Sequence, residues 1–136
     1  MFTTPCIIRK NTPELRQKLE KLGYTNCIIE DEKYLFTSHG IFDCISSCTA
    51  YEDMIRNGLV DCGDNELLFL ALAAMRDDTD KDQLFTNGID WAIKREAARN
   101  LGLPGFEYLT FPRDVDTPLH KATIEEIMNY FQTPIA

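Results

Sequence analysis

The sequence is poor in the residues and motifs that mark many functional sites. Its 136 residues include one tryptophan and two histidines. It has neither of the glycine-rich phosphate loops, G-x-G-x-x-G and G-x-x-x-x-G-K-S/T, so the backbone lacks the usual means of wrapping a phosphate. No apolar run approaches the roughly 18 residues that cross a bilayer, and the opening "MFTTPCIIRK" lacks a basic leader followed by an apolar core. We therefore expect no membrane partner and a cytoplasmic protein.

The cysteines argue against both disulfides and metal. They are an odd number without a secretory signal, which fits reduced thiols, and they are Cys6, Cys27, Cys44, Cys48 and Cys62. Zinc sites ordinarily use paired C-x2-C or C-x4-C knuckles, whereas here a C-x3-C is followed only by the lone and distant Cys62. Neither His39 nor His120 lies in a recognisable nucleophile context. We expect no metal, no cofactor and no catalytic residue, so an enzyme is the less favoured class.

Acidic residues outnumber basic ones. The chain has 22 aspartates and glutamates against 14 lysines and arginines, a formal charge of −8, and this field repels phosphate backbones at long range. We therefore expect no nucleic-acid partner. Hydrophobic residues at 44% and charged residues at 26% are typical of a folded domain, and 136 residues are the size of one. We predict a single domain over residues 1–136.

Apolar periodicity and capping residues predict the order of strands and helices. Strands are expected at residues 6–9, 27–30, 34–37, 41–45 and 105–111. Helices are expected to begin at five capping residues, namely Thr12, Thr49, Asp64, Asp90 and Thr123. Thr49 with Glu52, and Thr123 with Glu126, have the spacing of a capping box. The helix expected over 90–102 has an open alternative, because "WAI" also fits a strand.

The predicted fold class is α+β. We expect a small mixed or antiparallel sheet packed with four to five helices in a single pair of layers. The helix expected after Asp64, "NELLFLALAAMR", is apolar on nearly every face. Such a pattern is typical of a helix enclosed by other elements, so this helix is expected at the centre of the core.

The stretch "RKNTP" places two cations immediately before a predicted helix. Arg9 and Lys10 precede the helix capped by Thr12, whose unpaired N–H groups and dipole favour an anion. The sequence lacks the glycines that would let the backbone approach a phosphate closely. A simple Thr-Pro helix cap with solvated cations is therefore the favoured interpretation, and contact with an anionic ligand is the alternative.

A second cationic stretch, "FPRDVDTPLHKAT", also leads into a predicted helix. Arg113, His120 and Lys121 lie in it, where they could meet a phosphate or a carboxylate. Ordinary loop polarity is the plainer interpretation. Trp91 could stack on a base or sugar face, although a lone tryptophan more often belongs to the core.

Three stretches of the chain resemble known sequences. They are "PCIIRKNTPELRQKLEKLGY", "NELLFLALAAMRDDTDKDQLFT" and "HKATIEEIMNYF", and they resemble small uncharacterised proteins that phages of gut Bacteroidales carry and that are found in their hosts. The resemblance implies a phage or mobile-element origin and a bacterial host cytosol, and it supplies no activity or site residues. Small phage proteins commonly bind something of the host, and signalling nucleotides of phage defence are one target that this analogy suggests.

These observations favour a non-enzymatic binding protein that engages a host molecule, most concretely by sequestering an anionic nucleotide-type signal in counter-defence. The expected ligand-binding residues are Arg9, Lys10, Trp91, Arg113, His120 and Lys121. The first alternative is an acidic protein–protein inhibitor or interaction module that meets a basic host protein through Asp77, Asp78, Asp80 and Asp82. The second alternative is a small metal- or thiol-dependent hydrolase. A homo-oligomer is compatible with this size.

Overall fold

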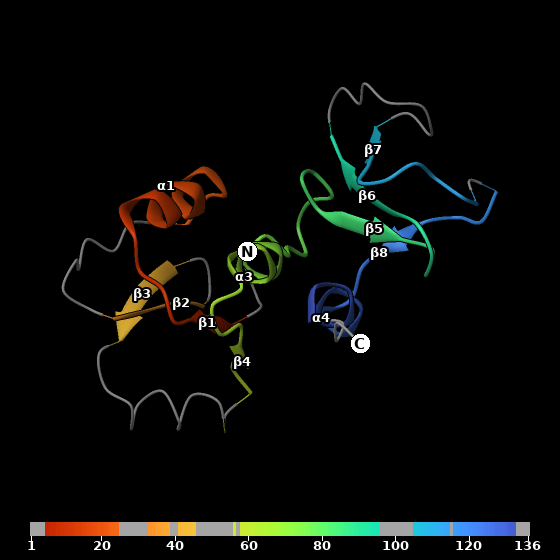
Figure 1. Cartoon of the computed structure of the whole chain (residues 1–136). Coiled ribbons are helices and arrows are strands. Elements are labelled where there is room, and N and C mark those ends of the chain that lie inside the picture. Colours follow the sequence, from red (N-terminus) through yellow and green to blue (C-terminus); the bar gives the residue numbers. More distant parts are fainter. Residues whose placement is uncertain are drawn as a thin grey trace. The chain divides into compact units, whose positions relative to one another are not determined.

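The structure is a computed structural model that describes residues 5–24, 33–38, 41–45, 56, 58–95, 105–114 and 116–132. Contacts within the chain divide it into two compact units, Met1–Met75 and Arg76–Ala136, which we call the N-terminal and C-terminal units (Figure 1). Each unit contains one sheet. The prediction that residues 1–136 form one domain stays a prediction beside this division.

The N-terminal unit combines a four-stranded sheet with two described helices. Its elements are β1 (Cys6–Ile8), α1 (Pro13–Lys21), β2 (Tyr34–Ser38), β3 (Ile41–Ile45), β4 (Val60–Asp61) and α3 (Glu66–Ala73). The strand order is β3-β2-β1-β4, with β1 antiparallel to β2 and parallel to β4. The predicted Thr12 cap is confirmed, since its hydroxyl oxygen accepts the Leu15 N–H at 3.2 Å and Pro13 follows in the first turn.

The core of the N-terminal unit lies between β1 and its helices. The three residues of β1 are fully buried, and α3 packs against this strand. The helix over 66–73 is confirmed, but its N-cap is Asn65 and not the predicted Asp64, because the Asn65 side chain accepts the Leu68 N–H at 3.0 Å. Leu68 is fully buried while its neighbour Leu67 is 67% exposed, so α3 is enclosed on one side only.

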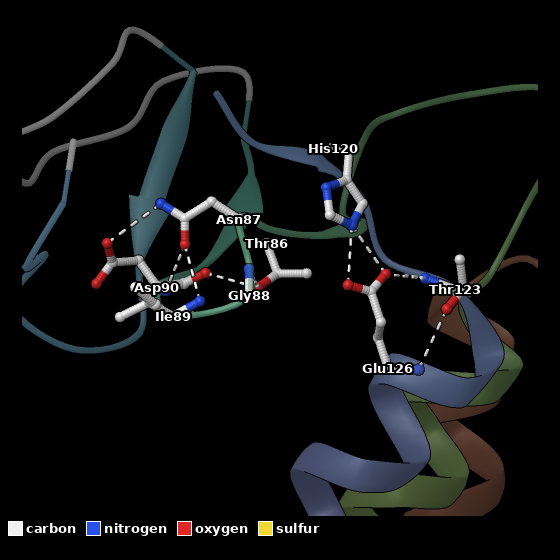
Figure 2. A network of polar contacts seen from close by, with 8 residues as sticks. All are labelled: Thr86, Asn87, Gly88, Ile89, Asp90, His120, Thr123 and Glu126. Atoms are coloured by element: carbon white, nitrogen blue, oxygen red, sulfur yellow. Dashed lines mark hydrogen bonds and ion pairs between the residues drawn. The ribbon is translucent and has the colours of Figure 1, made fainter. Parts of the chain in front are cut away.

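The C-terminal unit has an antiparallel sheet and one described helix. Its elements are β5 (Leu84–Thr86), β6 (Trp91–Lys94), β7 (Phe106–Tyr108), β8 (His120–Lys121) and α4 (Ile124–Gln132), with strand order β7-β6-β5-β8. The predicted capping box of α4 is confirmed. The Thr123 N–H donates to Glu126 Oε1 at 3.0 Å, and the Glu126 N–H donates to Thr123 Oγ1 at 3.2 Å (Figure 2).

The helix predicted over 90–102 is wrong at its start, where the chain forms β6 instead. Good helix formers in "KREAAR" favoured a helix, but aromatic and β-branched side chains at 91 and 93 suit a strand, and β6 pairs with both β5 and β7. Asp90 does not cap a helix, since its carboxylate accepts the N–H groups of Arg113 and Asp114. Pairing with distant segments therefore outweighed local propensity.

The predicted fold class needs a correction. The α+β class is confirmed, but the described part of the chain contains three helices, not four to five, and two sheets in place of one. Strand β5 was not expected. The strand predicted at 27–30 and the helix predicted to begin at Thr49 lie outside the described residues. In the ranges that are described, no helix has both the length and the apolar character that a membrane crossing requires.

Candidate functional site

The turn between β5 and β6 is held by the side chains of Thr86 and Asn87. Asn87 Oδ1 accepts the N–H groups of Ile89 at 2.9 Å and Asp90 at 2.7 Å, which is the geometry of an Asx turn (Figure 2). The buried Thr86 hydroxyl donates to the Asp90 carbonyl at 2.8 Å and accepts the Gly88 N–H at 3.0 Å. Gly88 has a φ of 96°, a left-handed conformation that glycine adopts without strain.

Asp90 fastens this turn to the chain that precedes β8. Its carboxylate accepts the backbone N–H groups of Arg113 and Asp114, both at 2.8 Å, and it is 1% exposed. Asn87 Nδ2 donates to the same carboxylate at 3.3 Å, to the Asp114 carbonyl at 2.9 Å and to the Thr117 carbonyl at 3.4 Å. We call these contacts of Asn87 and Asp90 with residues 113, 114 and 117 the Asn87–Asp90 network.

The charge of Asp90 is stabilised by this network. The hydrogen bond from the Arg113 N–H is the main cause that lowers the pKa of Asp90, and it outweighs the cost of burial with help from the Asp114 N–H and the Asn87 amide. The ionised carboxylate in turn adds to burial in raising the pKa of Tyr108. Asp90 is therefore a structural anion with filled hydrogen-bonding positions.

A shallow hollow of about 310 Å³ lies beside this turn. Its lining residues are Gly88, Trp91, Glu126, Asn129 and Tyr130. The rings of Trp91 and Tyr130 stack at a centroid distance of 4.4 Å and an angle of 29°. Trp91 is 8% exposed and Tyr130 is 39% exposed, so the tyrosine presents the larger accessible surface. The hollow thus brings an aromatic pair together with a carboxylate and an amide.

Glu126 is the charged group of the hollow. Burial by itself would raise the pKa of Glu126, but the Thr123 N–H and the His120 ring lower it below the ordinary value for a glutamate. His120 Nε2 lies 2.8 Å from Glu126 Oε2 (Figure 2). The carboxylate is thus ionised near neutral pH and is held in place by the capping box of α4.

The four predicted ligand residues of the C-terminal unit have different surroundings. Trp91 lines the hollow, whereas His120 does not line it but contacts Glu126, which does. Lys121 Nζ donates to the carbonyls of Arg76 and Thr79 and lies 3.7 Å from Asp80, so this ammonium stabilises the loop before β5. Arg113 is exposed, and its backbone N–H belongs to the Asn87–Asp90 network.

The two predicted ligand residues of the N-terminal unit both form ion pairs. Arg9 Nη2 lies 3.1 Å from Asp61 Oδ2, and Lys10 Nζ lies 3.1 Å from Glu66 Oε2. Lys18 also binds Glu66, at 2.6 Å, and its hydrogen bond is the main cause that lowers the pKa of Glu66, ahead of that from Lys10. These contacts favour the helix-cap interpretation of "RKNTP".

In the acidic loop at residues 77–82, three of the four aspartates lie close to a lysine or an arginine. Asp78 pairs with Arg76 at 2.8 Å, and Asp82 pairs with Arg95 at 2.7 Å. Asp80 lies 3.9 Å from Lys94 and 3.7 Å from Lys121. Among these residues the acidic surface is therefore weaker than the sequence "DDTDKD" indicates.

The described thiols do not have the character of nucleophiles. Cys6 and Cys62 are buried, and the pKa of Cys62 is raised well above its ordinary value by its hydrogen bond with Cys6 and by burial. No group of three or more potential metal ligands occurs in the ranges that the structure describes. Cys27, Cys48 and the side chain of Cys44 lie outside those ranges.

Sequence reasoning missed most of the residues that build the hollow. It identified Trp91 and the capping role of Glu126, but it did not connect them with Gly88, Asn129 and Tyr130. An available signal was the dipeptide "NG" at 87–88, which is typical of a tight turn between strands. Comparison with protein-family models, with curated proteins and with solved structures finds no match to this chain.

Proposed function

We propose that the protein is a non-enzymatic binding protein, and that the hollow beside Trp91 and Tyr130 takes a small planar ligand. The observation that carries the proposal is the meeting of this stacked aromatic pair with the ionised carboxylate of Glu126. Aromatic stacking with one oriented polar group is a common way to bind a flat heterocycle. Binding of this kind needs no nucleophile and no metal.

The chemistry of the hollow favours a ligand whose edge carries N–H donors. A carboxylate only accepts hydrogen bonds, whereas the Asn129 amide can donate and accept. The exposed part of Tyr130 supplies a surface for stacking. A nucleobase with an amino or imino edge, such as guanine, satisfies these requirements, so a nucleotide-type ligand remains the most concrete candidate.

The surroundings of the hollow support binding of the base of such a nucleotide better than binding of its phosphate. Within the hollow the charged side chain is Glu126, which repels an anion, and the chain as a whole carries a charge of −8. Arg9, Lys10 and Lys121 bind carboxylates or carbonyls of the protein. We therefore place the base in the hollow and the phosphate in solvent. In a cell, we propose, the protein would sequester a phage-defence signal in a bacterial cytosol; this part of the proposal rests on the phage resemblance.

A protein partner is the second candidate, and a specific observation favours it. In the C-terminal unit Phe111 is 83% exposed, Ile89 is 51% exposed and Leu109 is 39% exposed. Exposed large apolar side chains are common at interaction surfaces. Because Asp78, Asp80 and Asp82 are paired locally, an apolar contact has more support than the acidic contact expected from the sequence.

The test is thermal unfolding of the purified protein with a panel of nucleobases, nucleosides and mono-, di- and cyclic nucleotides, followed by calorimetry of any compound that raises the unfolding temperature. Tyr130→Ala and Glu126→Gln should each abolish the shift measured against their own baseline. Phe111→Ala, which removes an exposed aromatic ring outside the lining of the hollow, is the matched control and should retain it.

The variants also separate the two candidates. A shift that survives both Tyr130→Ala and Glu126→Gln would place the ligand elsewhere. Absence of any shift over the whole panel would remove the small-ligand proposal. Binding to a host protein that Phe111→Ala weakens, with Tyr130→Ala unaffected, would favour the interaction module.

A further inference from the structure

The pair Asn87–Gly88 has a chemical reactivity that the proposed function does not use. In an Asn-Gly sequence the glycine N can attack the asparagine Cγ, which forms a five-membered succinimide and releases ammonia. Water then opens the ring at either carbonyl and gives aspartate or isoaspartate. The net change is asparagine plus water to an acidic residue plus ammonia, and no oxidant or enzyme is needed. Glycine allows this attack because it has no side chain to obstruct it.

The folded turn blocks the first step at both reacting groups. Asn87 Oδ1 is held by the N–H groups of Ile89 and Asp90, which fixes the side chain over the following residues (Figure 2). The Gly88 N–H points to Thr86 Oγ1 at 3.0 Å, in the interior of the turn. Ring closure requires both sets of hydrogen bonds to break. It must therefore proceed from a locally opened state, whose population the stability of the turn controls.

Conversion of Asn87 would damage the network that surrounds it. Asn87 Nδ2 donates to three oxygens, those of the Asp90 carboxylate and of the Asp114 and Thr117 carbonyls. An aspartate in this place loses all three donated bonds and sets a negative charge beside Asp90. Isoaspartate also adds a backbone methylene to the turn. Either product weakens the attachment of residues 113 and 114 and alters Gly88, which lines the hollow.

We propose that Asn87 is a protected deamidation site. Its conversion to aspartate or isoaspartate opens the Asn87–Asp90 network and irreversibly alters the hollow that Gly88 lines. Thr86 acts as a positioning residue that holds Gly88 N away from the reaction. The chemistry of Asn87 is independent of which ligand the hollow binds. The time for which Asn87 stays unmodified is thereby set by the stability of the turn between β5 and β6.

The rate is measured by peptide mapping and mass spectrometry of the full chain kept at neutral and at mildly alkaline pH. We expect deamidation at Asn87 to be slower in the folded protein than in the same chain unfolded in urea by about tenfold or more, since only the opened turn reacts. Equal rates in the two states would overturn the proposal. Mapping also distinguishes Asn87 from Asn57, which precedes Gly58 in the second Asn-Gly pair.

Thr86→Val tests the protecting contact, because valine keeps the shape of threonine and removes the hydroxyl. It should accelerate deamidation of Asn87 in the folded protein several-fold. Thr37→Val is the matched control, since Thr37 is also fully buried but lies in the N-terminal unit and bonds to Cys6. An equal acceleration in both variants would reduce Thr86 to a general contribution to stability and would contradict its positioning role.

The consequence of modification is tested with Asn87→Asp. We expect the Arg113 and Asp114 N–H groups to lose hydrogen-exchange protection in this variant, while the N–H groups of α3 keep theirs. Unchanged protection at 113 and 114 would overturn the proposed opening. If the variant does not fold, partly deamidated wild-type protein separated by charge provides the same comparison.

Discussion

The two units are stabilised in different ways. Among the described residues, the largest fully buried side chains all belong to the N-terminal unit except Thr86 and Ile127. Both units bury polar side chains, which are Arg16 and Thr37 in the N-terminal unit and Gln83, Thr86 and Asp90 in the C-terminal unit. With fewer large apolar side chains fully buried, the C-terminal unit depends more on the directed hydrogen bonds of its three polar groups. An apolar core tolerates changes in the exact shape of its side chains, whereas every donor and acceptor of a buried polar network must have a hydrogen-bond partner. The hollow and the exposed Phe111 belong to the unit in which precise geometry matters more.

The largest effect is expected in the apolar core of the N-terminal unit. Leu68→Ala should lower the free energy of unfolding by about 2–5 kcal/mol, since Leu68 is fully buried and its truncation leaves a cavity in the core. Leu67→Ala, one residue earlier on the same helix, should change it by less than about 0.5 kcal/mol because Leu67 is 67% exposed. Urea unfolding measures both. Equal effects would contradict the assignment of one buried side to α3.

The next largest effect is expected when the Asn87–Asp90 network loses its charge. Asp90→Asn keeps the size of the side chain but turns one acceptor into a donor that faces the N–H groups of Arg113 and Asp114. We expect a lower urea midpoint and faster hydrogen exchange at 113 and 114, with α1 and α3 unaffected. Asp116→Asn, an exposed aspartate, is the control and should leave both readouts unchanged.

The same carboxylate predicts a dependence on pH. The pKa of Asp90 is lower in the folded state than in the unfolded state, so the unfolded chain binds more protons as the solution is acidified. The stabilisation is fully present above the ordinary aspartate pKa of about 3.9 and is lost as the pH falls through the folded-state value. Urea midpoints between about pH 2.5 and 6 should fall more steeply in the wild type than in Asp90→Asn. Parallel curves would contradict the role of Asp90.

A smaller effect is expected at the start of α4. Thr123→Ala removes the hydroxyl that accepts the Glu126 N–H, and loss of such a cap costs about 1 kcal/mol. Glu126→Gln should cost less, because glutamine preserves the reciprocal bond of a capping box. Circular dichroism and urea unfolding measure both, with Thr110→Ala at an exposed position as control. A larger loss in Glu126→Gln than in Thr123→Ala would show that the His120 contact, and not the cap, holds this helix.

What the sequence could predict depended on how far apart the contacting residues lie in the chain, in both units alike. Local signals were sufficient for α1 and α4, because Thr12 with Pro13 and Thr123 with Glu126 form their contacts within a few residues. Asp90 misled the prediction, since an aspartate before an apolar run has the pattern of a helix cap. The backbone N–H groups that its carboxylate accepts lie 23 and 24 residues away, and no local spacing reveals them.

The candidate site was predictable only in part for the same reason. Trp91 was singled out as the one tryptophan of the chain, but its stacking partner Tyr130 is 39 positions later and lies on α4. The cations expected at an anion site were chosen because they lie in stretches that lead into predicted helices. Their carboxylate partners could not be chosen from 22 acidic residues without the fold.

The smallest effect is expected at the ion pairs of the N-terminal unit, and it decides between the two interpretations of "RKNTP". Arg9→Ala and Lys10→Ala should each cost less than about 1 kcal/mol, since exposed pairs contribute little, and the difference from wild type should shrink in about 1 M salt. Lys21→Ala, at an exposed position of α1, is the control. Inorganic phosphate should raise the unfolding temperature of all four proteins equally if these cations only support the fold. A shift by phosphate that occurs in wild type and in Lys21→Ala, but in neither Arg9→Ala nor Lys10→Ala, would support the anion site. The ion pairs with Asp61 and Glu66 do not require phosphate, so only a bound anion would make the phosphate shift depend on these two cations.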